Sequence, residues 1–291
     1  MTSARFAKWN GRRREGDGAT ASPCSEANRA LFTAGNKNRV YSASRPGFGK
    51  SSDTQAELHK TGLSHLRKEN LPSTKPTVAV FDFDGTITYA DSFVPFLREA
   101  SGRAIFVIKL ILLGPILICG AFGFIGRKRL KEHLIRSFLS GKTITTLQII
   151  GERFCANRLQ CLLNPVALQR INWHRQQGHR LILLSASPEV YLTIWAAKNG
   201  IFEVIATRLQ ISGENITGYI DGENCRGPEK VKRLEAHLGH LDQYVLYAYG
   251  DSPADLELLQ HVSHPFYRSF LLDGGPIRPF HTWGKFLRAL V

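Results

Sequence analysis

The segment 77–88, TVAVFDFDGTIT, constrains the fold of this 291-residue chain more than any other. Its apolar and β-branched first half is typical of a buried strand in a parallel sheet, and a glycine ends the run. Asp82 and Asp84 follow directly, and ligands of open α/β sheets bind beyond the carboxyl ends of strands. Because strand side chains alternate, we expect both carboxylates to point the same way, with Phe83 turned away. Two like charges held together are costly unless a cation or a shared proton compensates, so this pair is a candidate catalytic or metal site.

Two further predicted strands end in polar residues. Residues 180–185, RLILLS, form an apolar run that ends at Ser185, and residues 244–250, YVLYAYG, precede Asp251 and Asp255. A helix-forming segment follows each strand, and Lys230 lies near the start of another helix between them. Alternating strands and helices predict an α/β fold, with a Rossmann-like, doubly wound parallel sheet that brings these strand ends to one edge.

Taken singly, each of these residues also has a structural interpretation. Ser185 could cap the helix that follows it, and Lys230 could be a solvated lysine. Asp251 could belong to a turn, with Asp255 one helical turn later. A D-x-D pair also occurs in surface turns and in sugar-nucleotide sites. Their occurrence together, in this order along alternating strands and helices, favours one shared site.

The order of these motifs resembles that of the haloacid dehalogenase (HAD) phosphohydrolase superfamily. Its first motif, D-x-D-G-T, is matched by Asp82–Thr86, and its second, a strand-ending Ser or Thr, by Ser185. Its third, a lysine, is matched by Lys230, and its fourth, G-D-x-x-x-D, by residues 250–255. The helical stretch between the first two motifs is similar to the cap that members of this superfamily insert there.

The resemblance implies a magnesium-dependent phosphomonoester hydrolase that works through an aspartyl-phosphate. Asp82 would be the nucleophile, and Asp84 the general acid for the leaving alcohol and then the base for water. Ser185 would hold a phosphoryl oxygen, and Lys230 would offset the crowded negative charge. Mg²⁺ favours such oxygen ligands. Its implied ligands are the Asp82 carboxylate, the Asp84 backbone carbonyl and Asp251, with Asp255 close by or acting through water.

Composition and the resemblance together predict a domain organisation. Residues 1–76 are rich in Arg, Ser and Gly and lack hydrophobic periodicity, so we predict a basic, disordered tail. The predicted divisions after it are a catalytic core of residues 77–87 and 177–272, a helical cap of residues 88–176 with an apolar hairpin at 104–126, and a C-terminal tail of residues 273–291.

The formal net charge of +14 is unevenly distributed. Residues 88–176 carry 13 Lys or Arg and 4 Asp or Glu, a net charge of +9, and residues 1–76 carry +8, while the core is near neutral. A positive cap suits an anionic surface or substrate, although the tail could equally be a solvated segment without a partner. Its few aromatic residues are widely scattered, so nucleic-acid binding is not expected.

Residues 104–126 are apolar apart from Lys109 and nearly reach the roughly 20 residues of a membrane-spanning helix. A single crossing would separate Asp82 from the other site residues, and two crossings would need roughly 40 residues. Pro115 is expected to break or kink the helix, and basic residues flank both ends. We therefore predict a membrane-dipping hairpin with both ends on the cytoplasmic side. The alternative is a buried helical hairpin inside a soluble cap.

Within the superfamily, the chain is similar to the branch that contains phosphoserine phosphatases and C-type phosphatidylglycerophosphatases. The sequence Ser185-Ala-Ser-Pro departs from the Ser-Gly-Gly usual in phosphoserine phosphatases, and Ser252-Pro-Ala departs from their fourth motif. The run Cys225-x-Gly-x-Glu-Lys-Val, together with the apolar, basic cap, looks more like the lipid-phosphate enzymes. The resemblance thus favours a membrane lipid phosphate such as phosphatidylglycerophosphate.

Such an enzyme would act at the cytoplasmic face of a membrane, which in a bacterium is the inner membrane. The first alternative is a soluble, cytoplasmic, small-molecule phosphatase similar to phosphoserine phosphatase. The second is a non-catalytic membrane or nucleic-acid binding protein that uses the basic cap and tail. The pair Asp82 and Asp84 argues against this second alternative, because a binding module does not need both carboxylates.

Overall fold

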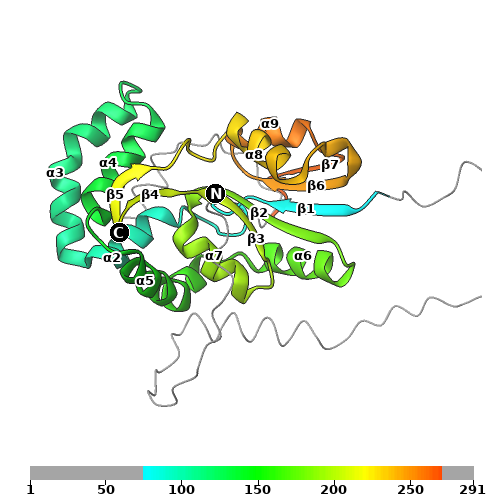
Figure 1. The fold of residues 1–291 in the computed structure, drawn as a ribbon, viewed down its shortest axis with the longest axis horizontal. Coiled ribbons are helices and arrows are strands. Elements are labelled where there is room, and N and C mark those ends of the chain that lie inside the picture. The colour runs from blue at the N-terminus through cyan, green and yellow to red at the C-terminus, as the bar shows by residue number, and fades with distance from the viewer. Residues whose placement is uncertain (1–74, 271–291) are drawn as a thin grey trace, which may run out of the picture.

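The computed structural model describes residues 75–270, and a parallel five-stranded sheet lies at its centre (Figure 1). The strand order is β3-β2-β1-β6-β7, and every neighbouring pair is parallel. The predicted α/β fold is therefore confirmed. The predicted tail 273–291 lies outside the described residues, as does the predicted tail 1–76 up to residue 74. The strands are β1 (Thr77–Phe81), β2 (Arg180–Pro188), β3 (Glu203–Thr207), β6 (Val245–Gly250) and β7 (His264–Tyr267).

Helices cover both faces of the sheet, which explains the unbroken apolar run of β1. Val78 and Val80 face α8 (Pro228–Leu238) and α9 (Leu256–Gln260), in one buried cluster. Ala79 and Phe81 face α6 (Pro165–Gln176) and α7 (Glu189–Lys198), in a second cluster that continues into the cap. Figure 1 shows α8 and α9 on one side of the strands and α6 and α7 on the other. A central strand buried on both faces needs apolar residues at every position rather than at alternate ones.

The register of the central strands places the polar residues at one edge of the sheet. Phe81, the last residue of β1, pairs with Leu183 of β2 and with Tyr249 of β6. Asp82 follows Phe81 directly, whereas Ser185 and Asp251 lie two residues beyond the partners of Phe81. Parallel strands in this register bring all three side chains to the carboxyl edge, as expected of a site in an open α/β sheet.

A helical insertion follows β1, as predicted, and lies at the left of the molecule in Figure 1. Its last helix, α5, packs against α7 of the core. The next helix, α6, falls within the range predicted for the cap, but it packs against β2 and contributes to the core. The inserted elements are α2 (Phe93–Ser101), α3 (Arg103–Ala121), α4 (Arg127–Leu139), α5 (Ile144–Asn157) and a short 3-10 helix, η1 (Leu159–Leu162).

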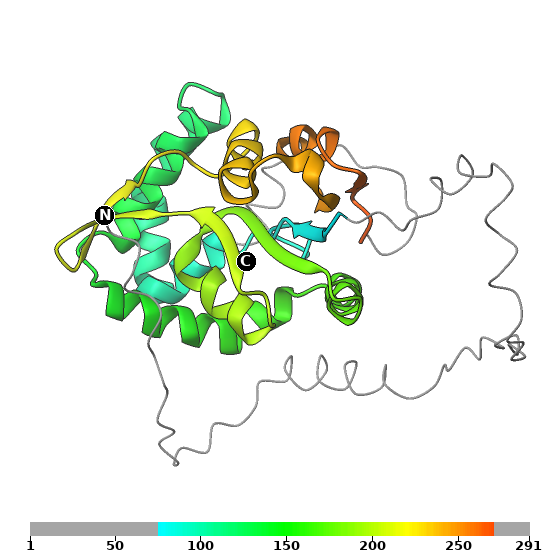
Figure 2. The ribbon, with the colours of Figure 1, turned by 45° about the vertical axis from the view of Figure 1, so that its right-hand side comes forward.

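A β-hairpin ties the insertion to the core. Strands β4 (Leu209–Ser212) and β5 (Asn215–Ile220) are antiparallel, and residues 213–214 join them. The backbone of Ile216 exchanges hydrogen bonds with the loop after α4: its N–H donates to the carbonyl of Lys142 at 3.0 Å, and its carbonyl accepts from Gly141 at 2.9 Å. Seen from the angle of Figure 2, the hairpin extends from the core to the cap helices. These bonds connect the cap to the hairpin that follows β3 of the core.

The apolar hairpin predicted at 104–126 is wrong, because α3 runs unbroken through Pro115 to Ala121. Proline removes one backbone hydrogen bond from a helix, and Pro115 lies on an exposed face where water can satisfy the freed carbonyl group. The buried-hairpin alternative fails as well, because Ile111 and Leu112 are 71% and 73% exposed. Among residues 75–270, α3 is the one helix whose length and composition would allow it to cross a membrane.

Candidate active site

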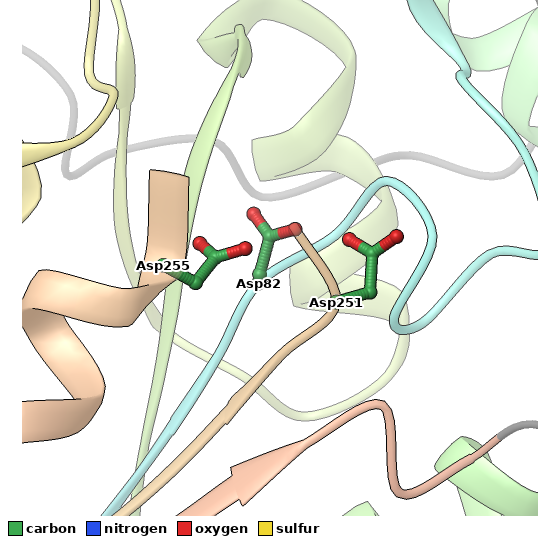
Figure 3. A group of neighbouring side chains, drawn as sticks. All are labelled: Asp82, Asp251 and Asp255. Carbon is green, nitrogen blue, oxygen red and sulfur yellow. The ribbon is translucent and has the colours of Figure 1, made fainter. Parts of the chain in front are cut away.

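Three buried carboxylates meet at the carboxyl edge of the sheet. Asp82 follows β1, Asp251 follows β6, and Asp255 ends a short 3-10 turn, η3 (Pro253–Asp255). One oxygen atom from each side chain lies within 4.8 Å of the others (Figure 3). The predicted convergence of Asp82 with Asp251, 169 positions later in the sequence, is thus present in the fold.

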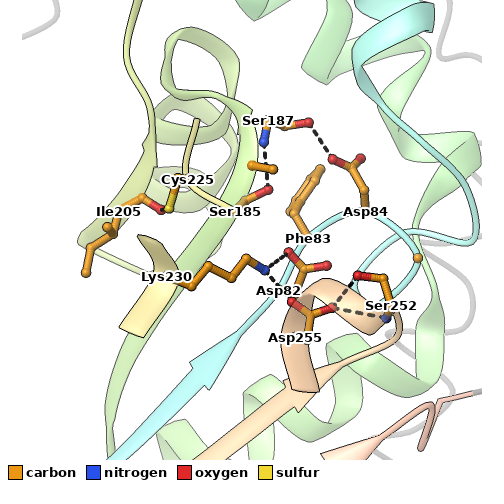
Figure 4. Close-up of polar contacts among 12 residues, drawn as sticks. Asp82, Phe83, Asp84, Ser185, Ser187, Ile205, Cys225, Lys230, Ser252 and Asp255 are labelled. Atoms are coloured by element: carbon orange, nitrogen blue, oxygen red, sulfur yellow. Dashed lines mark hydrogen bonds and ion pairs between the residues drawn. The ribbon is translucent and has the colours of Figure 1, made fainter. Parts of the chain in front are cut away.

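Lys230 lies between two of these carboxylates. Its Nζ is 2.7 Å from Oδ1 of Asp82 and 2.6 Å from Oδ1 of Asp255, and all three side chains are buried (Figure 4). Pro228 occupies the first position of α8, which helices tolerate, so Lys230 falls in the first turn, near the sheet edge. Burial alone lowers the pKa of Lys230, but the charges of Asp82 and Asp255 outweigh burial and raise it above its ordinary value. The lysine is therefore a fixed cation.

The two partners of Lys230 respond differently to it. Burial raises the pKa of Asp82 well above its ordinary value; Lys230 opposes this shift, whereas the charges of Asp255 and Asp251 add to it. Burial also acts against ionisation of Asp255, but the charge of Lys230 and hydrogen bonds hold the pKa of Asp255 below its usual value. An additional positive charge near Asp82 would therefore favour its ionised, nucleophilic form.

Asp255 has both of its oxygens engaged. Oδ1 contacts Lys230, while Oδ2 accepts hydrogen bonds from the backbone N–H of Ser252 at 3.0 Å and from its hydroxyl group at 2.8 Å. The bond from the Ser252 N–H, together with a bond that the Ser252 side chain accepts from the backbone N–H of Asp255, forms a capping box that fixes the turn after β6. Asp255 thus lies within the carboxylate cluster and contacts the ammonium group of Lys230, while its predicted place beside a metal ion stays a prediction.

The carboxylate group fits a divalent metal ion. Three carboxylates face one lysine within this cluster, so negative charge is in excess, and clustered carboxylate oxygens are the ligands that hard cations prefer. Gly85 adds a steric indication: a Cβ atom there would lie 2.1 Å from Oδ2 of Asp251, and the φ angle of Gly85 is +86°. Only glycine lets the Asp251 carboxylate come this close to the loop after β1. Asp82 and Asp251 are the residues best placed to hold the ion.

Asp84 faces the same cavity but has different partners. Its Oδ1 accepts a hydrogen bond from the backbone N–H of Ser92 at 2.7 Å, and its Oδ2 accepts one from the hydroxyl group of Ser187 (Figure 4). Strand β1 ends at Phe81. The alternation of strand side chains, from which we expected Asp82 and Asp84 to point the same way, therefore does not extend to Asp84. Phe83 is turned away into the core, as predicted, against Trp195. The predicted metal contact of Asp84 through its backbone carbonyl stays a prediction.

Ser185 and Ser187 line the cavity from the end of β2. Ser185 is buried in the predicted place, and its hydroxyl oxygen accepts a hydrogen bond from the N–H of Ser187 at 3.1 Å. Ser187 was not among the residues predicted from the sequence. The signal was the spacing, because residues two apart on a strand face the same way, and Ser187 lies two residues after Ser185.

The cavity around these residues has a volume of about 680 Å³ and lies between core and cap. Asp82, Asp84, Ser185, Lys230 and Asp251 all line it, so the structure brings the predicted catalytic residues into one space. Four charged residues that were not predicted as site residues complete the wall: Asp91, Arg127, Lys131 and Arg226.

Asp91 and Lys131 have strongly shifted pKa values. Burial raises the pKa of Asp91 to about 6, the charge of Asp84 adds to this shift, and Oδ1 of Asp91 accepts from the N–H of Val94 at 3.0 Å. Burial lowers the pKa of Lys131 to about 8, although the charges of Asp91 and Asp84 oppose this shift. Perturbed groups in a cavity are typical of functional sites.

Comparisons with known proteins agree with this geometry. A model of the haloacid dehalogenase-like hydrolases matches residues 79–260. Protein CicA of Caulobacter vibrioides is 34% identical over 197 residues, which are 67% of this chain and 87% of CicA. A probable phosphatase of Mycobacterium tuberculosis is 25% identical over 195 residues, which are 65% of this chain and 67% of that protein.

A solved structure shows the same fold. The crystal structure of a Bordetella pertussis protein of unknown function aligns with a TM-score of 0.60 and 23% identity, covering 65% of this chain and 88% of that one. The buried aspartates and the family match identify the reaction type as that of a HAD phosphatase. The chain belongs to the haloacid dehalogenase-like hydrolases.

Proposed function

We propose that this phosphatase hydrolyses phosphomonoesters carried by membrane lipids, such as phosphatidylglycerophosphate, at the cytoplasmic face of a bacterial inner membrane. The observation that carries the proposal is the position of α3. Its Leu117 and Ala121 line the cavity that holds Asp82, while its outer face exposes apolar side chains. Helix α3 therefore lines the cavity with one face and forms part of the protein surface with the other.

Asp82 acts as the nucleophile in this proposal. Its carboxylate attacks the phosphorus atom, an acyl-phosphate bond forms, and the bond from phosphorus to the alcohol oxygen breaks. Lys230, at 2.7 Å, orients the carboxylate and favours its ionised form. The Ser185 hydroxyl group lies at the same edge and would hold a phosphoryl oxygen. A bound Mg²⁺ ion would supply positive charge that stabilises the phosphoryl oxygens and the carboxylates.

Asp84 moves the protons. In the first step it gives its proton to the departing alcohol oxygen, and in the second it takes a proton from the water that attacks the acyl phosphate. Inorganic phosphate then leaves and Asp82 is regenerated. The hydrogen bonds from Ser92 and Ser187 fix the Asp84 carboxylate between core and cap, where it can face the leaving group.

The outer surface of the cap supports a lipid-linked substrate. Ile108, Ile111 and Leu112 of α3 are 58%, 71% and 73% exposed, and Phe124 in the following turn is 82% exposed. The basic run 127–131 comes directly after that turn. An apolar helix beside cationic residues is typical of a segment that lies in the interface of an anionic leaflet.

A comparison of four phosphate esters as substrates tests the proposal. The full-length protein, with Mg²⁺, is assayed for phosphate release from phosphatidylglycerophosphate and lysophosphatidate in mixed micelles, and from phosphoserine and p-nitrophenyl phosphate in solution. We expect kcat/KM for a lipid to exceed that for phosphoserine by about a hundredfold, because binding energy from remote substrate groups raises kcat/KM. Faster hydrolysis of phosphoserine would favour the soluble phosphatase instead. Release of phosphate from none of the four would contradict the proposal.

Membrane contact is tested separately by co-sedimentation with vesicles of phosphatidylglycerol and phosphatidylethanolamine. We expect the wild-type protein to sediment with the vesicles and the double variant Ile111→Gln, Leu112→Gln to remain in the supernatant. Phe202→Gln is the matched control, because Phe202 is 85% exposed but lies on the core. Equal sedimentation of the double variant and the wild type would exclude α3 as the contact.

A further inference from the structure

We propose that the active-site cavity contains a second anion-binding subsite, formed by Arg226, Arg127 and Lys131, for a phosphodiester group of the substrate. It would lie beside the place of the phosphate that is removed. This inference rests on the proposed function and specifies the substrate further, as a phospholipid whose headgroup carries a phosphodiester and a terminal phosphomonoester.

The charged residues of the cavity fall into two sets. Asp82, Asp84, Lys230 and Asp251 belong to the reaction centre at the sheet edge. The second set consists of Arg127, Lys131 and Arg226, with Asp91 as its single carboxylate. In the proposed reaction, the first set takes up the phosphomonoester. The second set has three cations and one carboxylate, and this local excess of positive charge favours a negative group of the ligand beside it.

The two arginines of this set carry the inference. Within residues 75–270, neither guanidinium group makes a hydrogen bond or an ion pair, although both side chains line the cavity. Burial lowers the pKa of Arg226, and the positive charge of Arg127 lowers it further, while the aspartates of the reaction centre offset part of this shift. Two neighbouring cations that lack a partner of opposite charge favour an anion, and a guanidinium group binds phosphate oxygens through two parallel N–H donors.

Lys131 connects the proposed subsite to the reaction centre. Its Nζ donates to the carbonyl of Ala186, which lies between Ser185 and Ser187, and to Oδ1 of Asn224 at 3.4 Å. An ammonium group has three donors, so one remains for a ligand. A phosphodiester bound here would therefore lie next to the end of β2, whose Ser185 is proposed to hold the phosphomonoester.

The subsite joins core and cap. Arg127 and Lys131 are four residues apart on α4, which puts them on one face of that helix, and Arg226 precedes α8, the helix that carries Lys230. Leu117 and Leu130 form an apolar wall of the same cavity. The cavity thus contains a reaction centre, a cationic subsite and an apolar wall formed in part by α3. These are the three kinds of surface that the phosphomonoester, the phosphodiester and the acyl chains of such a phospholipid would need.

Two soluble substrates, one with and one without a phosphodiester, measure what this group contributes to binding and hydrolysis. Glycerophosphoglycerol phosphate carries a phosphodiester and a terminal phosphomonoester, and glycerol 3-phosphate carries only the phosphomonoester. We expect the ratio of their kcat/KM values to favour the former and to fall about tenfold or more in Arg226→Gln and in Arg127→Gln, because each variant loses charge-assisted hydrogen bonds. Arg129→Gln, on the exposed face of α4, should keep the wild-type ratio. A ratio that is unchanged in both cavity variants would overturn the subsite.

Calorimetry separates this inference from the proposed function. The full-length Asp82→Asn variant is titrated with each of the two probes, so that binding is measured without turnover. Tighter binding of the phosphodiester probe, lost in Asp82→Asn/Arg127→Gln, supports the subsite even if the wild type hydrolyses no lipid. Equal binding of both probes refutes the subsite even if lipid hydrolysis is confirmed. Arg127 is exposed at the cavity mouth, so its replacement is expected to leave folding intact.

Discussion

Nζ of Lys230 lies 2.7 Å from Oδ1 of Asp82, and the two buried residues are 148 positions apart in the sequence. The contact joins α8 to the end of β1 and couples the stability of the fold to the chemistry of the site. Because Asp255 shares the same ammonium group at 2.6 Å, the lysine neutralises part of a cluster whose carboxylates would otherwise repel one another.

Replacement of Lys230 by Met tests this coupling. The variant keeps the volume but leaves Asp82 and Asp255 without their cation, so we expect a loss of about 3 kcal/mol of unfolding free energy, measured by urea denaturation with EDTA present. Added Mg²⁺ should restore part of it, because a ligand that binds the folded state stabilises it. Lys232→Met is the control, since Lys232 is 80% exposed. Equal stability of the two variants would show that Lys230 is not needed to balance these carboxylates.

Replacement of Asp251 by Asn tests the metal site. The amide removes one negative charge from the cluster but keeps its shape, so we expect the Mg²⁺ concentration needed for half-maximal hydrolysis of p-nitrophenyl phosphate to rise about tenfold or more. Asp221→Asn, on the surface, should require no more Mg²⁺ than the wild type. An unchanged Mg²⁺ requirement in Asp251→Asn would remove this carboxylate from the site.

Replacement of Ser187 by Ala tests how Asp84 is held. The Asp84 carboxylate loses one of its two hydrogen-bond donors, Ser187, and keeps the other, the N–H of Ser92. We expect kcat to fall about tenfold for alkyl phosphates and less for p-nitrophenyl phosphate, whose leaving group needs no proton. Ser187→Thr keeps the hydroxyl group and should recover much of the lost rate. An equal loss for both substrates would indicate a general structural effect.

Because His174 of α6 is buried, we expect the fold to lose stability in acid. Nδ1 of His174 is 2.7 Å from Nδ1 of His179, and Nε2 is 2.8 Å from the hydroxyl group of Tyr249. Burial, with a smaller contribution from the charge of His179, lowers the pKa of His174 from 6.5 to about 4. As the pH falls below 6.5, the unfolded chain takes up a proton at this histidine, whereas the folded chain takes it up only near pH 4. The free energy of unfolding therefore decreases as the pH is lowered from 6.5 to 4.

The size of this effect can be measured by urea denaturation at several pH values. For His174 alone we expect a loss of about 2 kcal/mol between pH 8 and pH 5, and His174→Gln should show a correspondingly smaller dependence. His261→Gln, at an exposed position, should follow the wild-type curve. If His174→Gln and the wild type have parallel curves, His174 is not the group responsible.

Much of the core could be predicted from the sequence because its signals are local. A strand buried on both faces, such as β1, shows an uninterrupted apolar run, and parallel strands bring their carboxyl ends to one edge. These two rules were enough to place Asp82 and Asp251 together. Lys230 followed from its position in the first turn of a helix between the strands.

The cap could not be predicted in the same way. Apolar composition does not distinguish a hairpin from a helix that continues through Pro115, because the outcome depends on whether water or protein surrounds the freed carbonyl. Lys131 and Arg226 were missed because their proximity depends on how α4 lies over the core. In the sequence they belong to charged stretches that are typical of a solvated surface.

The identity of the residue that carries the phosphoryl group is the most direct test of the account. The full-length protein is mixed with Mg²⁺ and a substrate that it hydrolyses, quenched in acid during turnover and reduced with borohydride, which converts an aspartyl-phosphate to homoserine; peptides are then mapped by mass spectrometry. We predict homoserine at position 82 in the wild type, and none there in Asp82→Asn. Phosphoryl transfer to Asp84, Asp251 or Ser185 instead would contradict it.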